Sequence, residues 1–143
     1  MSTAFTTNRP VDRRDSSAAS FTTRFLKPSV AVITATGELD ASNAQELADY
    51  ALRDVERTQR LALDLTGVDF FGTAGFSALH TLNVRCAAAG VEWILVPSSA
   101  VNRLLRICDP DSTLPLATTM SAALSHLQAD QRRSLLQLIT EPS

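Results

Sequence analysis

From residue 30 onward, short apolar runs alternate with stretches in which apolar residues recur at helical spacing. The runs occupy residues 30–36, 61–66 and 91–96, and a helical pattern follows each of them. Alternation of this kind indicates βαβ units, whose consecutive strands lie parallel in one sheet. Together with residues 21–26 and 114–116, it predicts an α/β fold with a mixed, mostly parallel sheet of about five strands and about four helices.

The first expected strand, residues 21–26, is joined to residues 30–36 by the turn Lys27-Pro28-Ser29. So short a connection pairs two strands antiparallel. We therefore expect residues 21–26 to form an antiparallel edge of the sheet.

The helix ends also carry signals. Ser42 and Gln45 fit a capping box before the first helix, with Ser42 accepting from the backbone and Gln45 reaching back. Gly90 is placed to end the second helix, and Ser98 or Ser99 to begin the third.

The length of 143 residues fits one domain. Residues 1–19 hold few large apolar side chains, so we expect a flexible N-terminal tail. Residues 20–130 form the expected domain, and residues 131–143 form a C-terminal extension. In that extension Leu135, Leu138 and Ile139 recur at helical spacing, and three uses remain open: packing on the domain, pairing two chains, or contacting a partner.

Composition and motifs argue against catalysis, a cofactor or a metal. A net charge of −2 disfavours a nucleic-acid partner, and no GxxxxGK[ST] motif is present. His80 and His126 are expected on helix surfaces. Cys86 and Cys108 lack metal-ligand spacing, so they are either small buried hydrophobes or, as the weaker alternative, a redox pair. Asp64, inside an apolar strand, either faces water or ends the buried part of that strand.

No stretch approaches the 18 or more apolar residues that a membrane-spanning helix needs. The first 20 residues lack the apolar central segment of a secretory signal. We therefore expect a cytoplasmic protein with no direct membrane insertion.

Two stretches resemble the STAS domain family: Gly-Glu-Leu-Asp at 37–40, followed by a helix, and LDLTGVDFFGTAGFSAL at 63–79. The similarity extends over roughly residues 21–127. The family includes the bacterial anti-sigma factor antagonists, and the resemblance implies a mixed sheet with helices largely on one face and no catalytic activity. The resemblance to this branch implies that the domain binds an anti-sigma factor with serine-kinase activity, which frees a sigma factor for transcription. Phosphorylation of the domain by that kinase then ends the interaction.

The phosphorylated turn of that branch has the pattern Asp-Ser-Ser/Thr-Gly, and its third residue takes the phosphate. The same positions here are Gly72, Thr73, Ala74 and Gly75. Because the usual acceptor position is Ala74, Thr73 is the phosphorylation candidate. Without phosphorylation, Thr73 is interpreted as an N-cap hydroxyl.

Asp40 also has two interpretations. The resemblance places it beside this turn and the docking face, whereas local geometry makes it a helix cap. Phe70, Phe71 or Phe76 can anchor a partner, and alternation along the strand does not tell which of them are buried. The expected partner-binding residues are Asp40, Gly72, Thr73, Ala74, Gly75 and Phe76.

We therefore expect a non-catalytic interaction module. It is either an anti-sigma factor antagonist, with Thr73 as the candidate point of regulation, or a divergent relative no longer controlled by serine phosphorylation. The alternative is a STAS accessory subunit that binds the ATPase of a lipid-transporting ABC system, since such subunits resemble Asp-Thr-Ala-Gly at this turn. A small-ligand sensor domain is a further alternative. Besides these partners, a second copy of the chain is a candidate partner in a homodimer.

Overall fold

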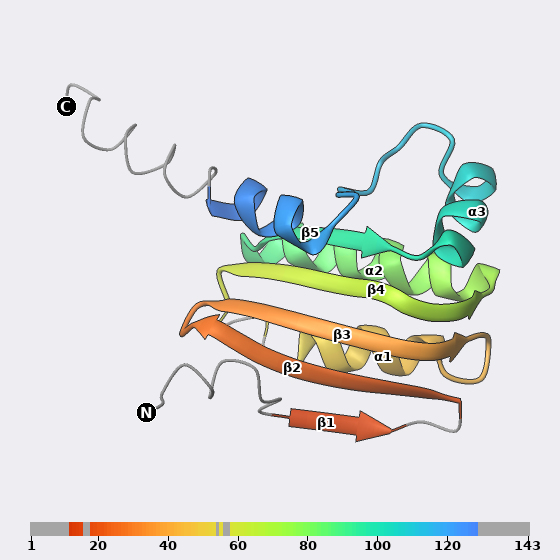
Figure 1. Cartoon of the computed structure of the whole chain (residues 1–143), viewed down its shortest axis with the longest axis horizontal. Coiled ribbons are helices and arrows are strands. Elements are labelled where there is room, and N and C mark those ends of the chain that lie inside the picture. The colour runs from red at the N-terminus through yellow and green to blue at the C-terminus, as the bar shows by residue number, and fades with distance from the viewer. Residues whose placement is uncertain (1–11, 16–17, 54, 56–57, 129–143) are drawn as a thin grey trace.

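The computed structural model describes residues 12–15, 18–53, 55 and 58–128. Its centre is a five-stranded sheet in the order β1-β2-β3-β4-β5 (Figure 1). The strands are β1 (Asp12–Asp15), β2 (Ala19–Lys27), β3 (Val30–Leu39), β4 (Arg60–Phe71) and β5 (Glu92–Pro97). β2 pairs antiparallel with both β1 and β3, whereas β3, β4 and β5 are parallel. The prediction of a mixed α/β sheet is confirmed.

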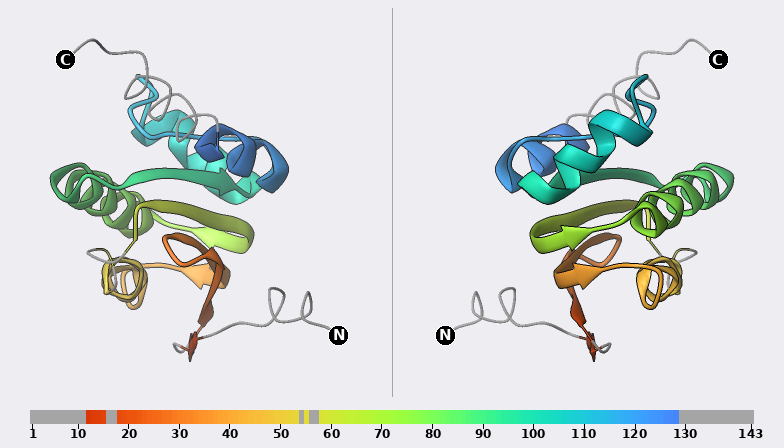
Figure 2. Two further views of the ribbon diagram at one scale, coloured as in Figure 1. Left: turned by 90° about the vertical axis from the view of Figure 1, so that its left-hand side faces the viewer. Right: turned by 90° about the vertical axis from the view of Figure 1, so that its right-hand side faces the viewer.

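The helices are α1 (Ala44–Leu52), α2 (Thr73–Ala89) and α3 (Ser99–Cys108), and residues 120–128 are helical as well. α1 and α2 lie on one side of the sheet, and the helical residues 120–128 lie on the opposite side (Figure 2). α3 contributes Val101 and Leu105 to the core on the side of α1 and α2. The helices are thus largely, though not entirely, on one face.

Two core layers explain why the central strands are apolar on both faces. Leu61, Leu63 and Leu65 of β4 point into the main core beneath α1 and α2. On the other face, Ala62 packs in a smaller cluster with Leu127 of the last described helix. Alternate side chains of a strand point to opposite faces, so both sets are buried.

β1 corrects the expectation for the N-terminus, because four residues of the expected flexible tail form a strand. Their apolar burial is slight, and the strand is held instead by pairing with β2 and by ion pairs. Asp12 pairs with Arg53, and Arg14 Nη2 lies 3.8 Å from Glu46 Oε1. β1, and not β2, is therefore the antiparallel edge of the sheet.

The strand expected at Leu114 and Leu116 is wrong. Only an isolated parallel bridge joins Leu116 to Leu95. Pro115 has no N–H to donate, so the pairing is limited to two bonds, Leu95 N to Pro115 O and Ala117 N to Leu95 O, each 2.9 Å long. The C-terminal extension at 131–143 and its apolar patch lie outside the described residues.

Two helix ends agree with expectation. Gly90 ends α2 in the left-handed conformation, with φ of 73°. Ser98 caps α3, its hydroxyl accepting from Val101 N at 3.2 Å.

Candidate functional site

The loops that follow β3 and β4 lie side by side because the two strands are parallel and end level with each other. Leu39 is paired with Phe71, and Gly72 N donates to Leu39 O at 2.9 Å. Asp40 therefore lies next to the turn that begins α2, at the right-hand end of the sheet in Figure 1. The structure thus brings together the two sequence segments that carry the predicted site.

Hydrogen bonds order the loop between β3 and α1. Asp40 Oδ1 accepts from the hydroxyl of Ser42 at 2.6 Å and from its backbone N–H at 2.9 Å. These bonds hold the pKa of the Asp40 carboxyl below its ordinary value of 3.8. Asp40 is consequently a carboxylate at neutral pH, fixed beside the α2 turn.

The capping box predicted at Ser42 and Gln45 is wrong. The N-cap of α1 is Asn43, whereas Gln45 Nε2 donates to Asp49 Oδ1 at 3.1 Å. Asn43 is buried, accepts from Asp40 N at 3.0 Å and donates to Glu38 O at 2.8 Å. Sequence reasoning did not single out Asn43, although an amide between a strand and a helix is a recognised turn signal.

The N-cap of α2 is Gly72, so the expected N-cap role of Thr73 is wrong. Thr73 is the first residue of the helix, and its exposed hydroxyl has no hydrogen-bond partner among the described residues. Ala74 is half-buried and packs against Ala44, Ala48 and Ala78, where α1 meets α2. Among residues 72–75, the exposed hydroxyl is therefore that of Thr73.

The two glycines of this turn differ in their surroundings. A Cβ at Gly75 would overlap the ring of Phe71, whereas a Cβ at Gly72 would come no closer than 3.5 Å to any atom, the nearest being on the Phe70 ring. Gly75 is also buried. Its role is therefore to admit the Phe71 ring, and it does not offer a contact to a partner.

The three phenylalanines have different environments. Phe71 is buried, and Phe76 is half-buried against the main core, with its ring centroid 6.4 Å from that of His80. Phe70 is 52% exposed. It was absent from the expected partner-binding set because the β3–β4 register shifts twice before Phe70, which breaks the alternation.

The other sequence candidates form no reactive group. His80 and His126 are exposed, as expected. Asp64 is half-buried and accepts from Thr66 N and Oγ1. Within the described ranges, no three His, Cys, Asp or Glu side chains converge as a metal site would require.

Both cysteines are free thiols. Cys86 is buried, which raises the pKa of its thiol to about 11. Reactive cysteines have a lowered pKa and are accessible, so this environment argues against the redox role of Cys86.

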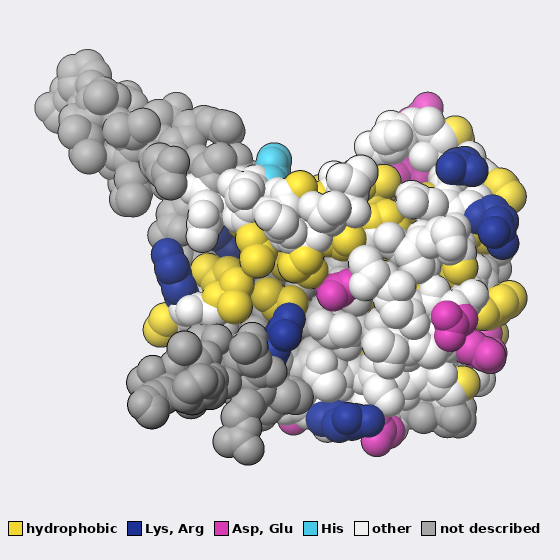
Figure 3. Space-filling model, in the orientation of Figure 1, with side chains coloured by type: hydrophobic (Ala, Val, Ile, Leu, Met, Phe, Trp, Pro, Cys, Tyr) yellow, Lys and Arg dark blue, Asp and Glu magenta, His cyan; other side chains and the backbone are white. Residues whose placement is uncertain are grey.

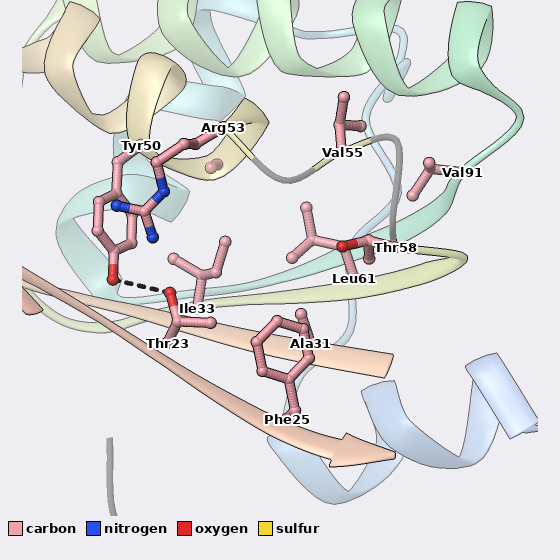
Figure 4. Close-up of a pocket in the computed structure, with 11 residues that line it drawn as sticks. Thr23, Phe25, Ala31, Ile33, Tyr50, Arg53, Val55, Thr58, Leu61 and Val91 are labelled. Atoms are coloured by element: carbon pink, nitrogen blue, oxygen red, sulfur yellow. Dashed lines mark hydrogen bonds between the residues drawn. The ribbon is translucent and has the colours of Figure 1, made fainter. Parts of the chain in front are cut away.

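A cavity between the sheet and α1 lies away from the α2 turn (Figure 4). It is lined mainly by apolar side chains, and the Tyr50 and Thr23 hydroxyls meet at its side 2.7 Å apart. Its volume of about 10 Å³ admits at most one water molecule. This cavity gives no support to a small-ligand sensor.

This sheet order, with the paired turns at the ends of β3 and β4, defines the class of protein. The family model of the STAS domain matches residues 26–123, and the chain belongs to that family. No helix in the described part of the chain has the length and hydropathy to cross a membrane.

Relatives specify the type within the family. Osmosensory protein A of Mycobacterium tuberculosis is 36% identical over 118 residues, covering 78% of this chain and 75% of that protein. Anti-sigma-F factor antagonist RsfA of the same species is 34% identical over 101 residues, covering 68% and 79%. A crystal structure of an anti-sigma factor antagonist from Mycobacterium paratuberculosis superposes with a TM-score of 0.69 at 23% identity, covering 78% and 95%. The chain is of the anti-sigma factor antagonist type, which is not catalytic.

Proposed function

We propose that this protein binds an anti-sigma factor and so releases a sigma factor for transcription in the cytoplasm. The contact is made by a surface that we name the docking edge, formed by Asp40, Phe70, Gly72, Thr73, Ala74 and Phe76. The proposal rests on one observation: in a chain of the antagonist type, the segment that carries the exposed Phe70 and Thr73 is joined by a hydrogen bond from Gly72 N to the oxygen of Leu39, the residue before the ordered Asp40.

The docking edge has features that suit protein binding. Phe70 supplies an exposed aromatic ring, and aromatic side chains often dominate the energy of interfaces. Small residues at 72 and 74 let a partner approach the start of α2 closely. A partner therefore meets an apolar anchor with little side-chain bulk around it.

Thr73 is the proposed point of regulation. A phosphate there adds about −1.5 to −2 charges at neutral pH. The start of α2 tolerates that charge in the free protein, because a helix N-terminus carries partial positive charge. In the complex the phosphate would be buried beside the Asp40 carboxylate, and desolvating it would cost several kcal/mol. Phosphorylation is therefore expected to release the partner.

The test compares Thr73→Glu with Thr73→Val by isothermal titration calorimetry against purified anti-sigma factors from the organism that encodes this chain. We expect the glutamate to weaken binding by about 10- to 100-fold, equivalent to about 1.4–2.8 kcal/mol, and the valine by less than about threefold. If Thr73→Glu and the wild type bind with equal affinity, Thr73 is not the point at which binding is regulated. Incubation with ATP and the bound kinase should place phosphate on Thr73 of the wild type, as read by mass spectrometry.

Binding measurements with purified partners also distinguish our proposal from the alternative of a transporter accessory subunit. Its supporting feature is the sequence Thr73-Ala74-Gly75, which resembles that of transporter STAS subunits. Binding to a purified ABC ATPase, with no binding to any anti-sigma factor, would favour it over our proposal.

A further inference from the structure

The outer face of α3 differs in character from its inner face. Val101 and Leu105 are buried in the core, whereas Arg103, Arg106 and Ile107 are exposed. Ile107, at 73%, is the most exposed large hydrophobic side chain in the described part of the chain. Basic and hydrophobic side chains lie next to each other over α3 in Figure 3.

Charge on this face is not neutralised locally. Neither Arg103 nor Arg106 forms an ion pair with a described residue, and α3 contains no acidic residue. Of the nearest acids in sequence, Asp109 is buried and accepts from Thr113 N, Thr113 Oγ1 and Leu114 N at 2.9, 2.7 and 3.1 Å. Asp111 is the exposed acid of the loop that follows. A chain with a net charge of −2 thus carries a local basic face.

A hollow of about 280 Å³ lies beside these residues. Its lining is mixed: Leu105, Pro110 and Leu116 are apolar, whereas Asn102, Arg106, Asp109 and Ser112 are polar or charged. Leu116 is itself 41% exposed. The face therefore combines two cations, an exposed isoleucine and a hollow whose lining is partly apolar.

We propose that this face of α3 is a second contact region for the anti-sigma factor, and that it takes a partner surface on which carboxylates flank an apolar patch. The inference rests on the proposed function. α3 begins just after β5 ends, at the same end of the sheet as the docking edge, so one partner can span both. A stable interface buries about 800 Å² on each partner, more than a few residues of one turn supply. The exposed isoleucine favours a protein partner, because the affinity for a polyanion depends mainly on cations.

The test uses the double variant Arg103→Glu/Arg106→Glu, the variant Ile107→Ser, and Arg85→Glu as a matched control. Arg85 is exposed on α2 and forms no ion pair with a described residue. Affinity for a purified anti-sigma factor that binds the wild type is measured at low and moderate salt. Circular dichroism and thermal unfolding show whether each variant is folded.

We expect the double reversal to weaken binding by about 30-fold or more at low salt, with a smaller loss at higher salt because charges are screened. Ile107→Ser should weaken it by about tenfold at both salt concentrations, and Arg85→Glu by less than about threefold. If both α3 variants bind like the wild type, α3 is not part of the interface, although the docking-edge proposal still stands. If the wild type binds no anti-sigma factor, both proposals fail. Binding of duplex DNA that the double reversal abolishes would overturn the inference in favour of a nucleic-acid site.

Discussion

At the scale of single residues, the turn that begins α2 depends on one glycine far more than on the other. The ring of Phe71 occupies the space beside Gly75 that a Cβ would need, and Phe71 is itself buried. Gly72 has an extended backbone, with φ of −92° and ψ of 178°, and room for a side chain. A Cβ at position 72 therefore meets only ordinary van der Waals contacts.

Gly75→Ala should lower the free energy of unfolding by about 1–2 kcal/mol, because overpacking typically costs about 1–3 kcal/mol and the helix regains up to about 1 kcal/mol from alanine. Gly72→Ser is the matched control and should change it by less than about 0.5 kcal/mol, since both residues suit an N-cap. Urea unfolding of both variants measures the difference. An alanine at 75 that leaves stability unchanged would contradict the close approach of Phe71.

At the scale of elements, the loop after α3 is shaped by the buried Asp109 carboxylate. Burial alone would raise the pKa of this group, but hydrogen bonds from Thr113 and Leu114 outweigh it and hold the pKa below the ordinary 3.8. A folded pKa below the unfolded one means that the ionised group stabilises the fold above about pH 3.8. That stability is lost as the pH falls through the folded value.

Asp109→Asn should therefore lower the free energy of unfolding at pH 7 by about 1–2 kcal/mol, the usual cost of weakening hydrogen bonds to a charged acceptor. Because asparagine does not titrate, the difference between variant and wild type should shrink as the pH falls below 3.8. Urea unfolding at a series of pH values between 7 and 3 tests this. A difference that stays constant down to the lowest pH would show that the carboxylate charge is not what stabilises the loop.

Most of these elements, but not all, could be predicted from the sequence alone. Apolar periodicity predicted β3, β4, β5 and the helices, because burial against neighbouring layers imposes that periodicity directly. β1 was missed because pairing with β2 and ion pairs to α1 hold it, and neither leaves an apolar pattern. The capping box failed because of local hydrogen bonds: the Ser42 hydroxyl donates to Asp40, and the Asn43 amide bonds to Asp40 N and Glu38 O, which makes Asn43 the N-cap of α1.

The candidate site was predicted in part. The adjacency of Asp40 and Thr73 follows from parallel strands that end together, which the βαβ pattern implies. The exposure of Phe70 depends on two shifts in the β3–β4 register, and the burial of Gly75 depends on the position of the Phe71 ring. No local sequence pattern encodes either of them.

At the scale of the whole molecule, the sheet holds two turns at one end and leaves the other end remote from them. The docking edge comprises loop and helix-start residues fixed by β3 and β4, whose opposite ends begin at Val30 and Arg60. A partner that binds at one end therefore leaves the amides of the other end unchanged.

Hydrogen–deuterium exchange of the complex with a purified anti-sigma factor tests the central claim most directly. We expect binding to slow exchange in residues 40–44 and 70–77 and to leave exchange in residues 27–30 and 58–60 as it is in the free protein. Slowed exchange confined to residues 27–30 and 58–60, with none at 40–44 or 70–77, would place the partner at the wrong end of the sheet and contradict the account.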